Sequence, residues 1–125
     1  MSGDIHLERA RRRLLERSQE RRKRLEGLRR QAAQDAEAIA VMIAARYKPV
    51  RIYQWGSVLR PGGFQEYSDV DIAVEGVSDA AVFFRMLEDA QAMTRMSLDL
   101  VQLEKIEPEY AEEIRQHGRV VYERP

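Results

Sequence analysis

The chain has 125 residues and a formal net charge of zero, with 44% hydrophobic and 34% charged residues. This composition is typical of one folded domain and excludes a disordered chain, because enough apolar surface is present for a single core. The absence of cysteine excludes a disulfide framework, thiolate chemistry and a Cys-ligated zinc site. No signal peptide and no stretch of about 18 apolar residues is seen, so we expect a cytoplasmic protein without a membrane span.

The zero net charge hides a division along the chain. Residues 1–30 carry 11 basic and 5 acidic side chains, a net charge of +6, whereas residues 31–125 carry 10 and 16, a net charge of −6. The basic segment predicts either an arm that meets a partner or a helix that stays solvated. Nucleic-acid binding is not favoured, because no aromatic residues interleave with its arginines.

The first expected element is a helix from residue 4 to about residue 47, because this stretch has no proline and consists mainly of good helix formers. Gly27 leaves two alternatives open, one long helix or two helices that meet there. Such a helix would be about 66 Å long, against about 30 Å for the remaining domain. We therefore expect about half of it to overhang, with only the part after Leu25 firmly packed.

The rest of the chain alternates between strand and helix patterns. A short helix near residues 58–60 is expected to stop at Pro61–Gly63, and Ser78 or Asp79 is expected to cap a helix. The predicted strands cover 50–55, 68–76, 96–103 and 119–122, and the predicted helices cover 80–94 and the segment from Pro108 to about Gly118. This order predicts an α/β (α+β) fold, a small mixed sheet flanked by helices.

Three aspartates stand in the predicted strands where apolar residues are expected. Residues i and i+2 of a strand share a face, so Asp69 and Asp71 project together. Asp99 is the single acid of the next strand, and neighbouring strands would bring all three carboxylates to one patch. Two carboxylates about 6 Å apart repel by roughly 3 kcal/mol at an effective dielectric constant of about 20. A divalent cation bound by oxygen ligands, Mg²⁺ or Mn²⁺, would relieve this repulsion.

Gly56 and Ser57 follow the first predicted strand and suggest a site for an anion. Glycine allows backbone N–H groups to approach a phosphate closely, and the serine adds a hydroxyl donor. Arg60 is expected either to contact phosphates or a partner, or to form an ion pair with Glu66. Trp55 is expected to belong to the core rather than to form a platform on which a base stacks. Carboxylates opposite a phosphate cradle suit phosphoryl or nucleotidyl transfer.

These motifs resemble the minimal nucleotidyltransferases of the DNA polymerase β superfamily. The similarity covers about residues 35–125 and rests on Gly56-Ser57, Arg60, the Ser-Asp-Val-Asp string at 68–71, "LDLV" at 98–101 and the closing "EEIRQHGRVVYE". The loop between Ser57 and Asp69 is one residue longer than is common in that family. The resemblance divides the chain into an Arg-rich helical extension, 1–30, and a minimal nucleotidyltransferase domain with the nucleotidyltransferase fold, 31–125.

The resemblance also implies roles for the site residues. Asp69, Asp71 and Asp99 would be catalytic and hold the metal, and Asp99 would accept the proton of the attacking hydroxyl. The nucleotide, with ATP as the substrate, would be bound by Gly56, Ser57 and Arg60.

Many members of this group act as the antitoxin of a HEPN-domain toxin and transfer AMP from ATP to one of its tyrosines. The resemblance therefore implies a HEPN-type partner, and the N-terminal helix could in addition support a homo-oligomer. Two alternatives stay open: a non-catalytic antitoxin or binding subunit, and a small-molecule nucleotidyltransferase (for example, of aminoglycosides) that needs a helical partner subunit.

Overall fold

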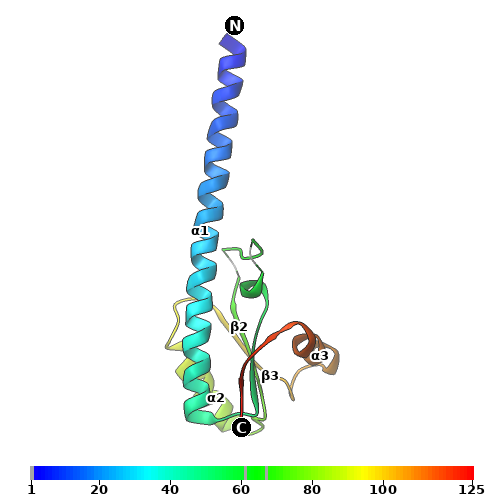
Figure 1. Ribbon diagram of the computed structural model, residues 1–125. Helices are drawn as coiled ribbons and strands as arrows, with labels where there is room; N and C mark the ends of the chain where they lie inside the picture. The colour runs from blue at the N-terminus through cyan, green and yellow to red at the C-terminus, as the bar shows by residue number, and fades with distance from the viewer. Residues whose placement is uncertain (1, 61, 67) are drawn as a thin grey trace.

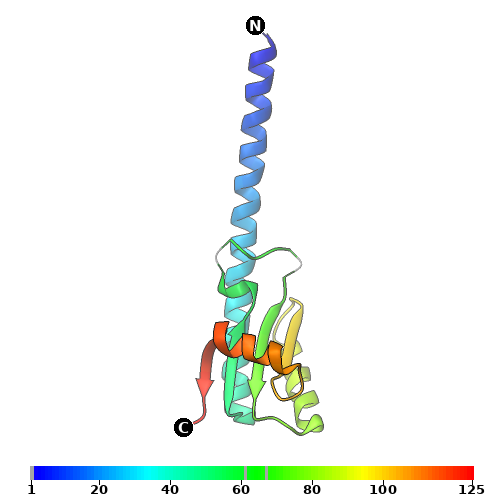
Figure 2. The same cartoon turned by 90° about the vertical axis from the view of Figure 1, so that its right-hand side faces the viewer.

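The computed structural model describes residues 2–60, 62–66 and 68–125, which form a four-stranded sheet with helices on both faces (Figures 1 and 2). Asp79 is the N-cap of the second helix, as expected, because its side chain accepts from the N–H groups of Ala81 and Val82. The elements are α1 (Ser2–Tyr47), β1 (Arg51–Trp55), the 3₁₀ turn η1 (Ser57–Leu59), β2 (Val70–Glu75), α2 (Ala80–Gln91), β3 (Leu98–Gln102), α3 (Pro108–His117) and β4 (Arg119–Glu123).

Helix α1 is continuous through Gly27, so the single long helix is the correct alternative of the two. It ends where Lys48 adopts a left-handed conformation, with φ of 48°, directly before Pro49. Proline disfavours helical geometry in the residue before it, which explains why the helix stops here.

The N-terminal part of α1 projects away from the rest of the molecule (Figure 1). Residues 3–24 are all exposed, and Leu25 is the first buried residue of the helix. At about 1.5 Å per residue this projection measures roughly 33 Å. Within the described residues, no helix combines the length and the apolar character needed to cross a membrane.

The sheet is mixed, with the strand order β3-β2-β1-β4. Strand β1 pairs antiparallel with both β2 and β4, whereas β2 and β3 are parallel. Parallel neighbours need a crossover connection, and α2 supplies it between β2 and β3. The predicted α+β fold with a small mixed sheet is therefore confirmed.

The two faces of the sheet carry separate apolar clusters. Helices α1 and α2 cover one face, and α3 lies across the other (Figures 1 and 2). Alternation along β2 and β3 decides which side chain meets which helix. The larger cluster contains Ile39, Ile43, Ile52, Phe64, Val70, Ile72, Val74, Met86 and Leu100, and the smaller one contains Tyr53, Ala73, Leu103, Ala111 and Ile114.

A 3₁₀ turn follows β1 where a short helix was expected. The Leu59 N–H donates to the Gly56 carbonyl at 3.2 Å, and the Arg60 N–H donates to the Ser57 carbonyl at 3.1 Å. The helical segment ends at Leu59. Pro61, which was expected to help end it, lies outside the described residues, so that part stays a prediction.

Candidate active site

The parallel pairing of β2 and β3 sets Asp71 directly beside Asp99. Both point away from α1 and α2, because their neighbours Ile72 and Leu100 belong to the larger core on that side. Asp69 stands two residues before Asp71, immediately ahead of β2. The structure thus places Asp71 and Asp99 side by side on the sheet face that α3 covers, with Asp69 just before the start of β2.

Burial and neighbouring negative charge disfavour the ionised form of two of these aspartates. Asp71 is only 8% exposed, and this burial, followed by the charges of Asp99 and Asp69, raises the pKa of the Asp71 carboxyl to about 7. Burial and the charge of Asp69 also raise the pKa of Asp99. Buried like charges disfavour ionisation, so the cluster favours binding of a proton or a cation.

Gly56 passes directly over the carboxylate of Asp71. Trp55 pairs with Asp71 across β1 and β2, and the chain then turns at Gly56, which has φ of 83°. A Cβ atom at position 56 would collide with Oδ2 of Asp71 and lie 2.9 Å from its Cγ. Both the positive φ and this close approach require glycine here, so the Gly-Ser turn and the acidic cluster form one site.

Arg60 lines a pocket of about 580 Å³ that begins at Gly56 and extends to α3 and Gly118. The alternative ion pair between Arg60 and Glu66 is not formed among the described residues. Glu66 instead accepts from Arg21 at 3.4 Å and from Arg24 at 3.1 Å, both on α1. Arg60 is exposed at the rim, and Ser57 is half-buried.

An aromatic pair borders the same pocket. Trp55 and Tyr110 meet edge to face, with ring centroids 5.5 Å apart and planes at 89°. Burial, then the charges of Asp99 and Asp71, raise the pKa of the Tyr110 hydroxyl, which places α3 within electrostatic range of the acids. Trp55 packs against the smaller core, as expected, but its buried Nε1 has no hydrogen-bond partner in the described part of the chain.

Sequence reasoning did not find Tyr110. The only signal was an aromatic residue in the helix that begins at Pro108, and nothing local indicates that this helix crosses the acidic face. The contact arises from tertiary packing of α3.

The donor set fits a hard divalent cation that shares its coordination with a ligand. Within the described residues, no three acidic or histidine side chains are arranged to hold a metal ion by themselves. Mg²⁺ is usually bound by one or two carboxylates together with phosphate oxygens and water, rather than by a cage of protein ligands. Carboxylates that carry a raised pKa beside a glycine turn meet this requirement.

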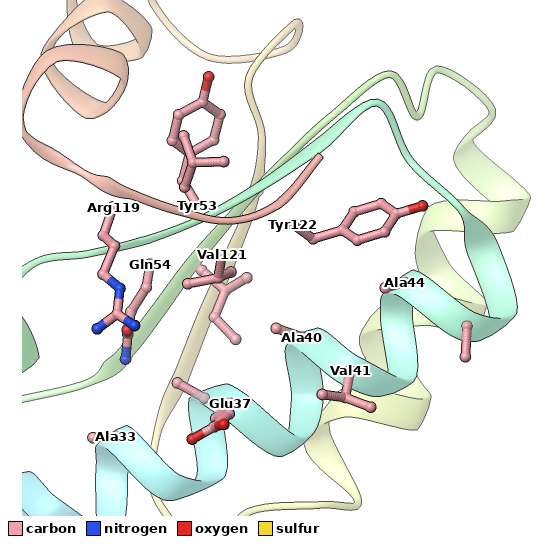
Figure 3. Close-up of a pocket in the computed structure, with 14 residues that line it drawn as sticks. Ala33, Glu37, Ala40, Val41, Ala44, Tyr53, Gln54, Arg119, Val121 and Tyr122 are labelled. Carbon is pink, nitrogen blue, oxygen red and sulfur yellow. The ribbon is translucent and has the colours of Figure 1, made fainter. Parts of the chain in front are cut away.

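A second pocket, of about 630 Å³, lies on the opposite face of the sheet, between α1 and β4 (Figure 3). Its walls are mainly small apolar side chains of α1, such as Ala40 and Val41, and of β4, such as Val121. It faces α1, whereas Asp71 and Asp99 lie on the sheet face that α3 covers, so it is separate from the acidic site.

Comparisons with known proteins agree with this geometry. A family model described as polymerase beta, nucleotidyltransferase, matches residues 37–125. No curated protein matches the chain. One similar solved structure, the toxin-antitoxin MntA-HepT, has a TM-score of 0.55 and 18% identity, over 73% of this chain and 72% of that chain.

A second similar structure is described as the toxin-antitoxin with AMP-PNP, with a TM-score of 0.57 and 21% identity, over 70% of this chain and 73% of that chain. At these identities, both structures show a shared fold. The family model covers most of the chain, including the Gly-Ser turn and all three aspartates. This chain therefore belongs to the polymerase beta family of nucleotidyltransferases.

Proposed function

We propose that this chain is a Mg²⁺-dependent nucleotidyltransferase that transfers AMP from ATP to a hydroxyl group of a partner protein. The observation that carries this proposal is the position of Gly56 against Asp71, with Asp99 beside it on the next strand. The glycine turn lies against two carboxylates, those of Asp71 and Asp99, whose pKa values are raised. Such an arrangement suits transfer of a nucleotidyl group.

In this proposal, Asp69, Asp71 and Asp99 hold Mg²⁺ or Mn²⁺, and Gly56, Ser57 and Arg60 hold the triphosphate. When bound, the metal ion would neutralise charge on the phosphates and on the acidic cluster.

The acceptor oxygen forms a bond to the α-phosphorus of ATP. The bond between this phosphorus and the oxygen that bridges it to the β-phosphate breaks, and pyrophosphate leaves. Asp99 takes the proton of the acceptor hydroxyl. Its raised pKa makes it a stronger base than an ordinary aspartate.

The proposed acceptor is a tyrosine on a HEPN-type toxin, so that this chain acts as the antitoxin. Two observations support this choice. The similar structures are toxin-antitoxin assemblies, and one of them was obtained with AMP-PNP. In addition, Arg60, which lines the pocket between Gly56 and α3, is exposed, so a protein surface can contact this side of the turn.

Within the Arg-rich extension, 1–30, the projecting residues 3–24 are proposed to provide a surface for association with the partner or a second copy, whereas the helix from Leu25 onward packs against the nucleotidyltransferase domain, 31–125. Leu7 and Leu14 are 70% and 65% exposed, and they lie seven residues apart on α1. Leucines at this spacing share one face of a helix. Covering them would remove apolar surface from water.

Incubation with Mg²⁺ and ATP labelled at the α-phosphate, together with the candidate HEPN partner, tests the proposal. We expect label on the partner with the wild-type chain and loss of at least about a hundredfold with Asp71→Asn, because the site then lacks a metal ligand. Asp4→Asn, in the exposed first turn of α1, is the matched control and should transfer normally.

Two other outcomes identify the alternatives. If the Asp71→Asn variant protects cells as well as the wild-type chain does, the protein acts as a non-catalytic antitoxin. Label transferred to an aminoglycoside, and not to protein, indicates a small-molecule enzyme. Absence of any label transfer by the wild-type chain would contradict the proposed activity.

A further inference from the structure

Arg29 on α1 reaches the turn that follows β1. Its Nη1 donates a hydrogen bond of 2.9 Å to the backbone carbonyl of Val58. Val58 lies in η1, directly after Ser57, and its side chain is 2% exposed in the larger core. A charged donor to a half-buried carbonyl is stronger than a bond between neutral groups.

The guanidinium of Arg29 is itself held in place by Glu26. Its Nε donates to Oε2 at 2.9 Å, and its Nη2 donates to Oε1 at 2.6 Å. This two-pronged geometry fixes the plane of the guanidinium as well as its position. The hydrogen bond from Arg29 also lowers the pKa of Glu26, which therefore stays ionised near neutral pH. The remaining nitrogen, Nη1, is thus directed at the carbonyl oxygen of Val58.

The 3₁₀ turn η1 has few internal hydrogen bonds, so a contact from another element is needed to fix its position. Its internal hydrogen bonds use the carbonyls of Gly56 and Ser57, which leaves the Val58 carbonyl for Arg29. A single 3₁₀ turn of three residues has poorer hydrogen-bond geometry than an α-helix and cannot define its orientation alone. The bond to α1 supplies that orientation.

Other contacts between α1 and this loop are weaker. The pairs from Arg21 and Arg24 to Glu66 involve side chains that are 53% and 60% exposed, against 20% for Arg29. Exposed ion pairs are screened by solvent and contribute little. Arg29 is therefore the principal polar link between the helix and the turn.

We infer that Arg29 is a positioning residue of the nucleotidyltransferase site. By holding the Val58 carbonyl, it fixes the backbone of Gly56 and Ser57 against Asp71 in the place where a triphosphate would bind. This inference rests on the proposed function for the identity of the ligand. It assigns part of the Arg-rich segment to the active site rather than to a partner.

The test compares Arg29→Met with Arg30→Met in the full-length chain. Both changes remove one positive charge, but Arg30 is 75% exposed and only pairs with Glu26 at 3.6 Å. Calorimetry with Mg²⁺ and ATP should show affinity weakened roughly tenfold in Arg29→Met and little changed in Arg30→Met. Arg29→Lys, which keeps a single donor, should recover part of the loss.

Amide hydrogen exchange in the absence of nucleotide gives a second readout. We expect faster exchange at residues 59 and 60 in Arg29→Met, with the exchange of β2 unchanged, because only the turn is released. Unchanged exchange in the turn, or equal loss of affinity in Arg29→Met and Arg30→Met, would overturn the inference. A wild-type chain that binds no nucleotide would overturn the proposed function instead, and exchange would still decide whether Arg29 anchors the turn.

Discussion

The two faces of β2 serve different purposes. On one side, Val70, Ile72 and Val74 are at most 1% exposed and pack beneath α1 and α2. On the other side, Asp71 lies beside Asp99 and beneath Gly56. Because side chains alternate along a strand, a shift of one residue in register would exchange the two sets. The core therefore fixes the register that holds the acidic site.

The two faces also differ in their contribution to the free energy of folding. The apolar face contributes free energy of folding by removing surface from water. The acidic face holds carboxylates that burial and mutual repulsion disfavour, as the raised pKa of Asp71 shows. Sites with such a composition commonly reduce stability in exchange for function.

The largest effect is expected on the apolar face. Ile72→Ala should lower the free energy of unfolding by about 2–5 kcal/mol, because it leaves a cavity in a closely packed core. Urea denaturation followed by circular dichroism measures this loss. A change below about 1 kcal/mol would contradict the view that this face supplies the stability.

A change of opposite sign is expected on the acidic face. Asp71→Asn should raise the free energy of unfolding of the metal-free chain by roughly 1–3 kcal/mol near pH 8, since it removes a buried charge. It should also abolish the stabilisation that we expect Mg²⁺ and ATP to give to the wild-type chain. Thermal unfolding with and without these ligands measures both effects. A destabilised Asp71→Asn chain would show that this carboxylate supports the fold instead.

The same carboxyl group predicts how stability depends on pH. Its pKa is about 7 when folded, against an ordinary value of 3.8, so between these values the folded chain binds more protons than the unfolded chain. The free energy of unfolding of the metal-free protein should therefore fall, by about 1–2 kcal/mol, from pH 5 to pH 7.

Denaturation curves at several pH values test this dependence, and Asp71→Asn should show a flatter profile. A wild-type profile that rises over the same range would contradict the assignment.

The smallest effect on stability is expected from the projecting part of α1. Removal of residues 1–20 should change the free energy of unfolding of the monomer by less than about 0.5 kcal/mol, since the described residues of this segment are exposed. The shortened chain retains the contacts of Arg21, Arg24 and Arg29. If the segment supports self-association, light scattering should show fewer chains per particle than for the full-length protein, and an unchanged number of chains would remove that proposal.

The positions of the acidic residues were predictable from the sequence because they depend on residues close together in the chain. The spacing of Asp69 and Asp71 fixes a shared face, and the Gly-Ser pair marks a turn that can approach an anion. The same alternation predicts which face of its strand Asp99 occupies. It does not predict which strand lies next to that strand in the sheet. The roles of these residues in binding a metal ion and a nucleotide stay predictions.

Contacts between distant segments could not be predicted. The bond from Arg29 to Val58 spans 29 residues, and nothing in the Arg-rich pattern distinguishes Arg29 from its neighbours. The end of α2 illustrates the same limit. The helix was expected to reach residue 94 but ends at Gln91, and the Thr94 hydroxyl donates to Asp35 on α1 at 2.7 Å. A tertiary hydrogen bond thus holds residue 94 outside the helix.

Calorimetric titration of the full-length chain with ATP in the presence of Mg²⁺ tests the central claim most directly. We expect one site per chain, no binding when Mg²⁺ is removed, and loss of binding in Asp71→Asn but not in Asp4→Asn. Binding of ATP with equal affinity by Asp71→Asn, or by the wild-type chain without any divalent cation, would contradict the account.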